Sequence, residues 1–256
     1  MILCVSIGNT NVRCAVGSKE SYREAVLKTD KLLSPDVFLK FLNGQFQSGF
    51  TDLLQGGIIS SVVPQKTSII TDALHHQAGE ILLKPVETSS CGIDISSYKG
   101  KLGEDRAVCC AAAMAKYEPP AIVIDFGTAT TINVINADKA FTGGVIMVGM
   151  QTGLDALSRQ TAQLPEVCGD FELDVICDDT EKSLMSGAVI GTAFAVEGFI
   201  KYIKTKLKCA PKVIITGGNA PLILKHCNFR FIYEPTLLID GLFELYGHIN
   251  IEIGEF

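Results

Sequence analysis

Two segments of the chain, 119 positions apart, show the same order of residue types. Residues 2–10, Ile-Leu-Cys-Val-Ser-Ile-Gly-Asn-Thr, align without a gap on residues 121–129, Ala-Ile-Val-Ile-Asp-Phe-Gly-Thr-Ala. In each copy a second apolar run follows the glycine, at 12–16 and at 131–135. A strand, a tight turn containing glycine and a second strand produce this order. The repeat therefore predicts a chain made of two related halves.

Strand and helix patterns alternate along the chain, which is typical of the α/β class. Short apolar runs bounded by glycine predict buried strands at 2–5, 57–63, 121–124, 144–148 and 213–215. Longer patterns with helical spacing predict helices at 35–42, 67–77, 104–117, 149–159, 180–207 and 237–246. Because the adjacent Pro119 and Pro120 end the helix before them, we place the domain boundary there, with one half at 1–118 and the other at 119–256.

Length and charge exclude several classes of protein. The 256 residues suffice for one large or two modest domains with a sizeable core. Since 28 acidic residues outnumber 22 basic ones and no basic block stands out, nucleic acid is not an expected partner. No uninterrupted apolar stretch reaches the roughly 18 residues that a membrane span needs, so none is expected. The first residues lack the basic start and cleavage site of a signal peptide, which predicts a cytoplasmic protein.

The two glycine turns of the repeat have features of phosphate-binding loops. Backbone N–H groups of such a turn can point at one anion, and Gly8 and Gly127 would let the backbone approach a phosphoryl oxygen. The hydroxyl groups of Thr10 and Thr128 offer further hydrogen bonds. For a single copy, an ordinary glycine hairpin is the favoured interpretation. Two copies in register, with a further glycine segment at 216–220 after a third apolar run, favour a nucleotide held between two half-domains.

Asp125 directly follows four apolar residues, so its carboxylate is expected at the end of a buried strand. A buried carboxylate without compensation is costly, and a cation is one natural compensation. The alternative is that Asp125 only caps a turn or accepts backbone hydrogen bonds there. The sequence predicts a cation site at this position and leaves the second interpretation open.

The segment Gly103-Glu104-Asp105-Arg106 precedes an alanine-rich helical pattern, which places Asp105 and Arg106 in a first helical turn. A carboxylate there can accept a proton from a hydroxyl group that attacks a phosphoryl group. A guanidinium can hold a carboxylate or a phosphate with two hydrogen bonds. Aspartate at a helix start is more often a simple cap, and the same interpretation applies to Thr180 at the start of the longest helical pattern.

Several short segments, taken in order, resemble the type III pantothenate kinases over nearly the whole chain. They are Ile7-Gly8-Asn9-Thr10-Asn11, Ser60-Ser61-Val62-Val63-Pro64, Gly103-Glu104-Asp105-Arg106, Asp125-Phe126-Gly127-Thr128-Ala129-Thr130, Gly143-Gly144-Val145-Ile146 and Thr161-Ala162-Gln163-Leu164-Pro165. The resemblance continues through 180–187, 216–218 and 238–242. Each segment alone is a weak signal, but the ordered set is specific.

This resemblance implies an α/β fold of two duplicated actin-like (ribonuclease H-like) ATPase domains, with mixed sheets flanked by helices, as in the acetate and sugar kinase superfamily. It also implies a homodimer. The implied reaction transfers the γ-phosphoryl group of ATP to the primary hydroxyl of pantothenate. The product is 4'-phosphopantothenate, formed in the first step of coenzyme A synthesis. ATP, Mg²⁺ and a monovalent cation, either K⁺ or NH₄⁺, are the implied cofactors.

The resemblance also implies roles for individual residues. Asp105 is the implied general base, and Asp125 is the implied ligand of the monovalent cation. The implied contacts of pantothenate are Tyr98, Gly103, Glu104, Asp105, Arg106 and Thr180. The implied contacts of ATP are Thr128 and the first phosphate loop, which comprises Ser6, Ile7, Gly8, Asn9, Thr10, Asn11, Val12 and Arg13.

The chain departs from the family pattern at three places. Ser6 stands where the family carries aspartate, and the internal repeat also sets Ser6 opposite Asp125. Tyr98 stands five positions before Gly103 without the usual Asn-Pro, and Val148 replaces a proline. Because serine supplies no negative charge near magnesium, one alternative is a weakly active or non-catalytic regulatory homologue that binds nucleotide or pantothenate. A third hypothesis is a kinase of the same fold that phosphorylates another small alcohol.

Overall fold

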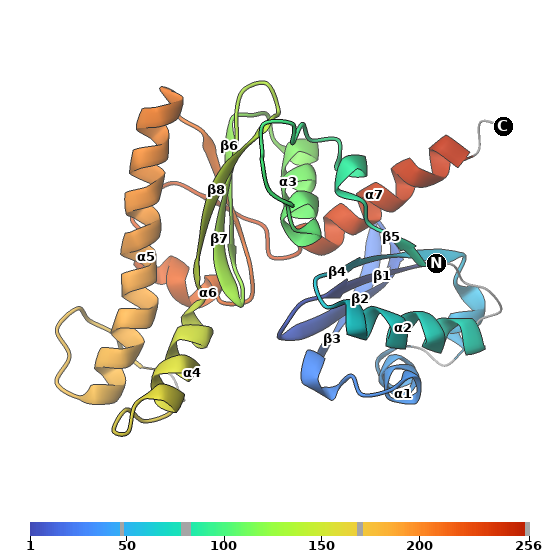
Figure 1. Ribbon diagram of the computed structural model, residues 1–256, viewed down its shortest axis with the longest axis horizontal. Helices are drawn as coiled ribbons and strands as arrows, with labels where there is room; N and C mark the ends of the chain where they lie inside the picture. Colours follow the sequence, from blue (N-terminus) through green and yellow to red (C-terminus); the bar gives the residue numbers. More distant parts are fainter. Residues whose placement is uncertain (47–48, 78–82, 168–170, 254–256) are drawn as a thin grey trace. The chain divides into compact units, whose positions relative to one another are not determined.

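The chain forms two compact units, each built around one five-stranded sheet (Figure 1). The computed structural model describes residues 1–46, 49–77, 83–167 and 171–253. The first unit comprises Met1–Ile93, Gly100–Ala112 and Thr236–Phe256, and the second comprises Asp94–Lys99 and Ala113–Pro235. Both sheets contain parallel and antiparallel pairs, so the predicted α/β class with mixed sheets is confirmed.

The sheet of the first unit has the strand order β3-β2-β1-β4-β5. Its strands are β1 (Ile2–Ile7), β2 (Asn11–Ser18), β3 (Ser21–Lys28), β4 (Gly56–Ser61) and β5 (Leu83–Pro85). The helices are α1 (Pro35–Gln45), α2 (Pro64–Gln77), most of α3 (Glu104–Lys116) and α7 (Leu237–Ile253). Short 3₁₀ helices lie at Thr29–Lys31, Phe50–Leu53 and Thr88–Cys91.

Side chains of β1 alternate between the two faces of this sheet. Leu3, Val5 and Ile7 belong to a hydrophobic core that also contains residues of α1 and α2. Because successive strand residues point to opposite faces, Cys4 and Ser6 lie on the other side. Helix α7 packs against β1 and β4.

The sheet of the second unit has the strand order β10-β9-β6-β7-β8. Its strands are β6 (Ala121–Phe126), β7 (Ala129–Ile135), β8 (Phe141–Val148), β9 (Lys212–Thr216) and β10 (Ile232–Tyr233). The helices are α4 (Met150–Gln160), α5 (Thr180–Leu207) and α6 (Ala220–Ile223), followed by a 3₁₀ helix at Leu224–His226. Ile122 and Ile124 of β6 share one core with Val189 and Ala193 of α5.

The two sheets have the same topology, which confirms the predicted duplication. In each, three antiparallel strands (β1-β2-β3 or β6-β7-β8) are followed by two parallel strands on the other side of the first (β4-β5 or β9-β10). The turn between β6 and β7 is one residue shorter than the turn between β1 and β2. Ile7 pairs with Val12, whereas its counterpart Phe126 pairs with Thr130. The offset of the repeat therefore changes from 119 on the first strands to 118 on the second strands.

The predicted elements occur in the predicted order, with differences at their ends. β8 begins at Phe141 rather than at 144, and α2 begins at Pro64 because proline is favoured in a first helical turn. α7 continues to Ile253. β3 was not predicted, because it is an edge strand whose side chains are mostly exposed and its short apolar run, Ala25-Val26-Leu27, is not bounded by glycine.

The compact units differ from the predicted halves at 1–118 and 119–256, since 94–99 and 113–118 lie in the second unit and 236–256 lie in the first. The largest difference concerns helix α7. It comes last in the chain but packs on β1 and β4 of the first unit. A Cβ added at Gly241 would lie 2.7 Å from Val108 Cγ1 and 3.0 Å from Ala112 Cβ, so glycine lets α7 lie close against α3. Burial of its apolar face, rather than its place in the sequence, assigns α7 to the first sheet.

Helix α5 is long and apolar enough to cross a membrane by length and composition alone, since an 18-residue window has a mean hydropathy of 1.5. The sequence-based expectation concerned an uninterrupted apolar stretch, and α5 contains none of that length because polar residues such as Ser186, Thr192 and Glu197 interrupt it. The core helix of a globular protein passes the same test, and 44% of the window is buried. Val189, Ala193 and Val196 of α5 lie in the core of the second unit. Core packing thus accounts for much of the apolar composition.

Candidate active site

The turn between β1 and β2 is held by hydrogen bonds from its own backbone and from Thr29. Gly8 N–H donates to the carbonyl of Asn11 at 2.9 Å. Thr29 Oγ1 donates to the Gly8 carbonyl at 2.7 Å, and Thr29 N–H donates to the Thr10 carbonyl at 2.9 Å. Asn9 and Thr10 are exposed at the tip. The Gly8 N–H is therefore used inside the turn, and the tip residues are the ones that face solvent.

The other residues of the predicted ATP loop differ in what they can contact. Ile7 and Val12 are buried at 1% and 0% exposure, so only their backbone can reach a ligand. Ser6 is 6% exposed and stands next to Ser60 in the parallel register. Arg13 is paired with Glu24 at 3.2 Å. The side chains of this loop therefore do not form one polar surface.

The first turn of α3 directs its two carboxylates onto backbone N–H groups. Asp105 Oδ1 accepts a hydrogen bond from Arg106 N–H at 2.8 Å. A Cβ added at Gly103 would lie 2.8 Å from that same oxygen, so the observed Asp105 position requires glycine there. Glu104 Oε2 accepts a hydrogen bond from Ser61 N–H at 3.0 Å. The helix start thus presents a fixed aspartate, and the neighbouring glutamate is engaged with β4.

In the second unit, the Asp125 carboxylate lies against two glycine turns. Asp125 pairs with Thr131 and Thr216 near the end of β6. A Cβ added at Gly217 would lie 2.4 Å from Asp125 Oδ1, and one at Gly127 would lie 3.4 Å from it. Gly217 also has a φ of 103°, which L residues rarely adopt. The two glycines therefore form a cradle around this carboxylate, because side chains at either position would crowd its oxygen.

Helices α4 and α6 hold the turn that follows Asp125. Thr152 Oγ1 and Gly149 N–H donate to the Thr128 carbonyl at 2.7 Å and 3.1 Å. Asn219 Nδ2 donates to the Gly127 carbonyl at 3.2 Å. Sequence reasoning did not find Gly149 and Thr152, whereas Asn219 lies in the glycine segment at 216–220 that it did identify. For Gly149, the available signal was a glycine directly after β8.

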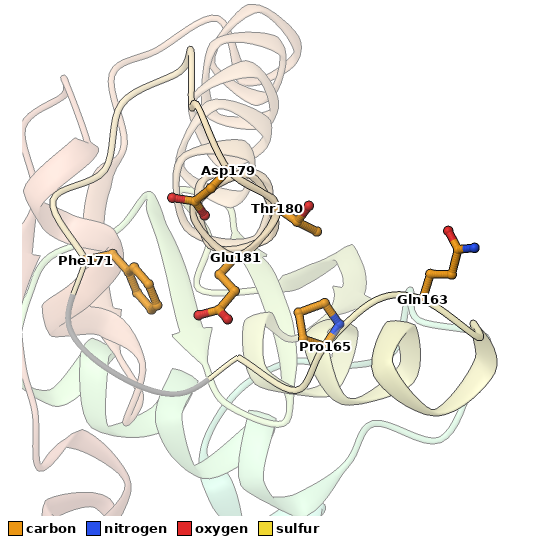
Figure 2. Close-up of a pocket in the computed structure, with 6 residues that line it drawn as sticks. All are labelled: Gln163, Pro165, Phe171, Asp179, Thr180 and Glu181. Carbon is orange, nitrogen blue, oxygen red and sulfur yellow. The ribbon is translucent and has the colours of Figure 1, made fainter.

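The start of α5 borders a cavity of about 550 Å³ (Figure 2). The cavity is lined by Gln163, Pro165, Phe171, Asp179, Thr180 and Glu181. These side chains come from the loop after α4 and from the junction of a second loop with α5. Only Thr180 was predicted, because periodicity does not show which loops lie side by side. The segment at 161–165, which carries part of the family resemblance, is thereby placed beside Thr180.

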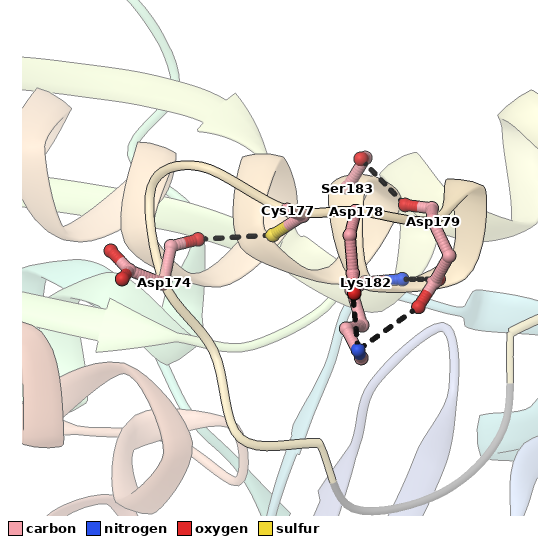
Figure 3. A network of polar contacts seen from close by, with 6 residues as sticks. All are labelled: Asp174, Cys177, Asp178, Asp179, Lys182 and Ser183. Atoms are coloured by element: carbon pink, nitrogen blue, oxygen red, sulfur yellow. Dashed lines mark hydrogen bonds and ion pairs between the residues drawn. The ribbon is translucent and has the colours of Figure 1, made fainter.

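A charged cap fixes the first turn of α5 (Figure 3). Asp179 Oδ1 accepts a hydrogen bond from Lys182 N–H at 2.8 Å. Lys182 Nζ contacts Asp178 Oδ1 at 2.8 Å and Asp179 Oδ2 at 3.2 Å. The Lys182 side chain lowers the pKa of Asp178, and the Lys182 backbone N–H lowers the pKa of Asp179. Thr180 is therefore the first helical residue after an aspartate cap and is not the cap itself.

Tyr98, another predicted pantothenate contact, lies in the second unit, whereas 103–106 belongs to the first. Its ring packs edge-on against Phe141 with centroids 5.0 Å apart. Its N–H donates to the Ile95 carbonyl at 2.9 Å. The structure therefore gives Tyr98 a packing partner on β8.

The donor set bears on the metal ions that a kinase uses. Within the residues that the structure describes, no group of three or more His, Cys, Asp or Glu side chains is placed to hold a metal. Mg²⁺ commonly keeps several waters and binds through one or two carboxylates and the substrate phosphates. A Mg²⁺ ion bound in that way does not need a cluster of three such side chains.

Solved structures with the same fold include proteins of different activity. A Campylobacter jejuni protein assigned to the Baf family of transcriptional activators has a TM-score of 0.61, 20% identity, and coverage of 97% of this chain and 99% of its own. A Sinorhizobium meliloti protein assigned as a 2-dehydro-3-deoxygalactonokinase has a TM-score of 0.60, 12% identity and 97% coverage of both chains. The ethanolamine utilization protein EutJ of Carboxydothermus hydrogenoformans has a TM-score of 0.55, 14% identity, and coverage of 94% of this chain and 88% of its own. The fold is therefore the actin-like ATPase fold, as predicted.

Sequence comparison identifies the family. The model of the type III pantothenate kinase family matches residues 2–202. The type III pantothenate kinase of Sulfurihydrogenibium sp. (strain YO3AOP1) is 33% identical over 257 residues, which cover 96% of this chain and 99% of the relative. On both grounds, the chain belongs to the type III pantothenate kinase family.

Proposed function

We propose that Asp105 is the general base in the reaction of this family, the ATP-dependent phosphorylation of the primary hydroxyl of pantothenate. Family membership, shown by the match over 2–202, assigns this reaction to the chain. The product, 4'-phosphopantothenate, is formed in the first step of coenzyme A synthesis. We place the reaction in the cytoplasm, in keeping with a metabolic kinase.

The position of Asp105 supports its role as base. One carboxylate oxygen, Oδ1, is held by Arg106 N–H at 2.8 Å. Across the described ranges, Oδ2 accepts no hydrogen bond, so it is available to receive the hydroxyl proton. The substrate oxygen then forms a bond to the γ-phosphorus while the bond to the β,γ-bridging oxygen breaks and ADP leaves. Since this chemistry depends mainly on positioning and charge stabilisation, a fixed carboxylate is what it requires.

ATP and a divalent metal ion belong to the reaction of a kinase of this family. We assign the phosphates to the β1–β2 turn, from Ser6 to Arg13, and to Thr128. Bound Mg²⁺ neutralises charge on the phosphates. The Ser6 hydroxyl can offer it an oxygen but no charge. We assign pantothenate to Gly103, Asp105, Arg106, Tyr98 and Thr180, with the Arg106 guanidinium suited to a carboxylate.

The two alternatives receive no support. Neither the family match nor the curated relative favours a non-catalytic regulatory role. Both name pantothenate rather than another small alcohol as the substrate. A panel of small alcohols assayed beside pantothenate tests this choice directly.

We assign a monovalent cation to the Asp125 carboxylate, so turnover is expected to rise with K⁺ or NH₄⁺ relative to Na⁺. Asp125→Asn keeps the size of the side chain and removes its charge, so it should lower K⁺-stimulated turnover at least about tenfold. A coupled ADP-release assay with ATP, Mg²⁺ and pantothenate, run in the three salts, measures this. Equal wild-type rates in all three salts would contradict the cation assignment.

We also propose a homodimer formed through the exposed face of α5. This face carries Gly187, Gly191, Phe194, Gly198 and Tyr202 at helical spacing, with Phe194 and Tyr202 56% and 61% exposed. A Cβ added at any of the three glycines would meet nothing within 4 Å. Because each exposed helical glycine costs about 1 kcal/mol relative to alanine, their presence is explained by close approach of a second helix.

Phe194→Asp is expected to turn the dimer into a monomer, since loss of a central aromatic contact costs about 2 kcal/mol or more. Light scattering at several protein concentrations measures the mass. Leu33→Asp is the matched control, because Leu33 is 69% exposed and lies in the other unit. The assignment fails if both variants keep the wild-type mass.

A further inference from the structure

The Glu104 side chain ties the start of α3 to the end of β4 within the first unit. Its Oε2 accepts a hydrogen bond from Ser61 N–H at 3.0 Å. Ser61 ends β4 and pairs with Ile7 at the end of β1. These are the strand ends from which the β1–β2 turn projects, so the contact joins the proposed phosphate turn to the helix that carries Asp105.

The Glu104 carboxylate serves as the hydrogen-bond acceptor for a strand N–H group that β5 is too short to reach. Val62 N–H donates to the Ile7 carbonyl at 3.0 Å, so the N–H of Ser61 points to the opposite side, towards β5. β5 ends at Pro85, which pairs with Ile59, and therefore does not reach Ser61. The Glu104 carboxylate thus accepts the Ser61 N–H in place of a backbone carbonyl of a longer β5. A negative group is also favourable at the start of α3.

Glu104 faces a different space from Asp105. It lines a cavity of about 450 Å³ together with Ser61, Thr67 and Thr71, and neither Asp105 nor Arg106 is among the lining residues. Cys91 also lies near Glu104: burial first, and the Glu104 charge second, raise the pKa of the Cys91 thiol to about 11. The surroundings of Glu104 therefore belong to the sheet and to α2.

We propose that Glu104 is a positioning residue, which sets the distance between Asp105 and the β1–β2 turn by accepting the Ser61 N–H, and that it does not contact pantothenate. This replaces the substrate contact that the family resemblance implied for Glu104. The inference rests on the proposed role of Asp105 as base. It predicts that the acceptor oxygen matters, whereas the charge does not.

Amide exchange and kinetics of Glu104→Ala and Glu104→Gln test this inference. Glutamine keeps an acceptor oxygen, so exchange of the Ser61 amide, measured by NMR, should stay near the wild-type rate in E104Q and become about tenfold faster in E104A. The kcat of E104A should fall about tenfold, with KM for pantothenate changed less than about twofold, and E104Q should recover most of the kcat. Glu87→Ala, which removes an exposed charge in the same unit, is the control.

The other outcomes decide against the inference. A loss in E104A that appears in KM for pantothenate and is not recovered by E104Q would show a substrate contact. An unchanged rate of Ser61 amide exchange in E104A would show that the hydrogen bond from Ser61 to Glu104 does not stabilise the end of β4. If E104A does not fold, Glu104→Asp, one methylene shorter, gives the same comparison. Failure of the proposed base is distinguishable, since Asp105→Asn would then keep its kcat while E104A still changes Ser61 exchange.

Discussion

Replacement of Asp105 by asparagine is expected to lower kcat by about 10²–10⁴-fold and to leave the fold intact. The asparagine carbonyl oxygen can still accept the Arg106 N–H and lie over Gly103, so the start of α3 keeps its geometry. Its amide group cannot accept the hydroxyl proton. The coupled ADP-release assay gives kcat, and a thermal melt shows whether the variant is folded.

Asp52→Asn is the matched control for this substitution. Asp52 is exposed in the 3₁₀ helix Phe50–Leu53 of the same unit, so the loss of its charge should change neither kcat nor the melting temperature. KM for ATP should change little in Asp105→Asn, because Asp105 is assigned to the hydroxyl and not to the nucleotide. A folded Asp105→Asn variant with wild-type kcat would remove Asp105 from the mechanism.

The internal repeat predicted much of the fold, because a strand, a turn and a strand leave a local signal in each half. Its limits are physical. β3 lies at an edge with mostly exposed side chains, and its short run Ala25-Val26-Leu27 is not bounded by glycine. α7 is visible as a helix, but its amphipathic pattern does not say which sheet it will cover. Local patterns therefore predict elements well and long-range packing poorly.

In the candidate site, too, local patterns predicted the position of a residue along its element but not its tertiary contacts. Asp125 was predicted at the end of a strand from the apolar run before it, and it lies there. Its neighbour Gly217 is far away in sequence and is brought beside it by the parallel pairing of β6 and β9. Glu104 stands in the motif beside Asp105, which suggested a shared ligand, yet its carboxylate contacts Ser61. A motif gives adjacency along the chain, whereas the partner of each side chain depends on the tertiary fold.

Substitution of Gly217 by alanine is expected to disrupt the Asp125 cradle. The new Cβ would lie 2.4 Å from Asp125 Oδ1 and 2.5 Å from Phe126 N, so the carboxylate or the turn must move. A displacement of about 1 Å can cost about 10²-fold in rate, and we expect a loss of this size in kcat/KM for ATP, with K⁺ stimulation abolished. Backbone strain and the clash together should lower the free energy of unfolding by about 2–4 kcal/mol.

Gly143→Ala separates these two causes. Gly143 has a φ of 119°, so alanine there pays a similar backbone cost, but its Cβ would meet nothing within 4 Å. This variant should lose stability, measured by urea unfolding, and keep turnover within about threefold of wild type. If both variants lose turnover equally, strain in the second unit is sufficient to explain the loss. If only Gly217→Ala loses turnover, the position of the Asp125 carboxylate controls the reaction. Glycine is then needed at 217 because the Asp125 carboxylate occupies the space that a side chain at this position would fill.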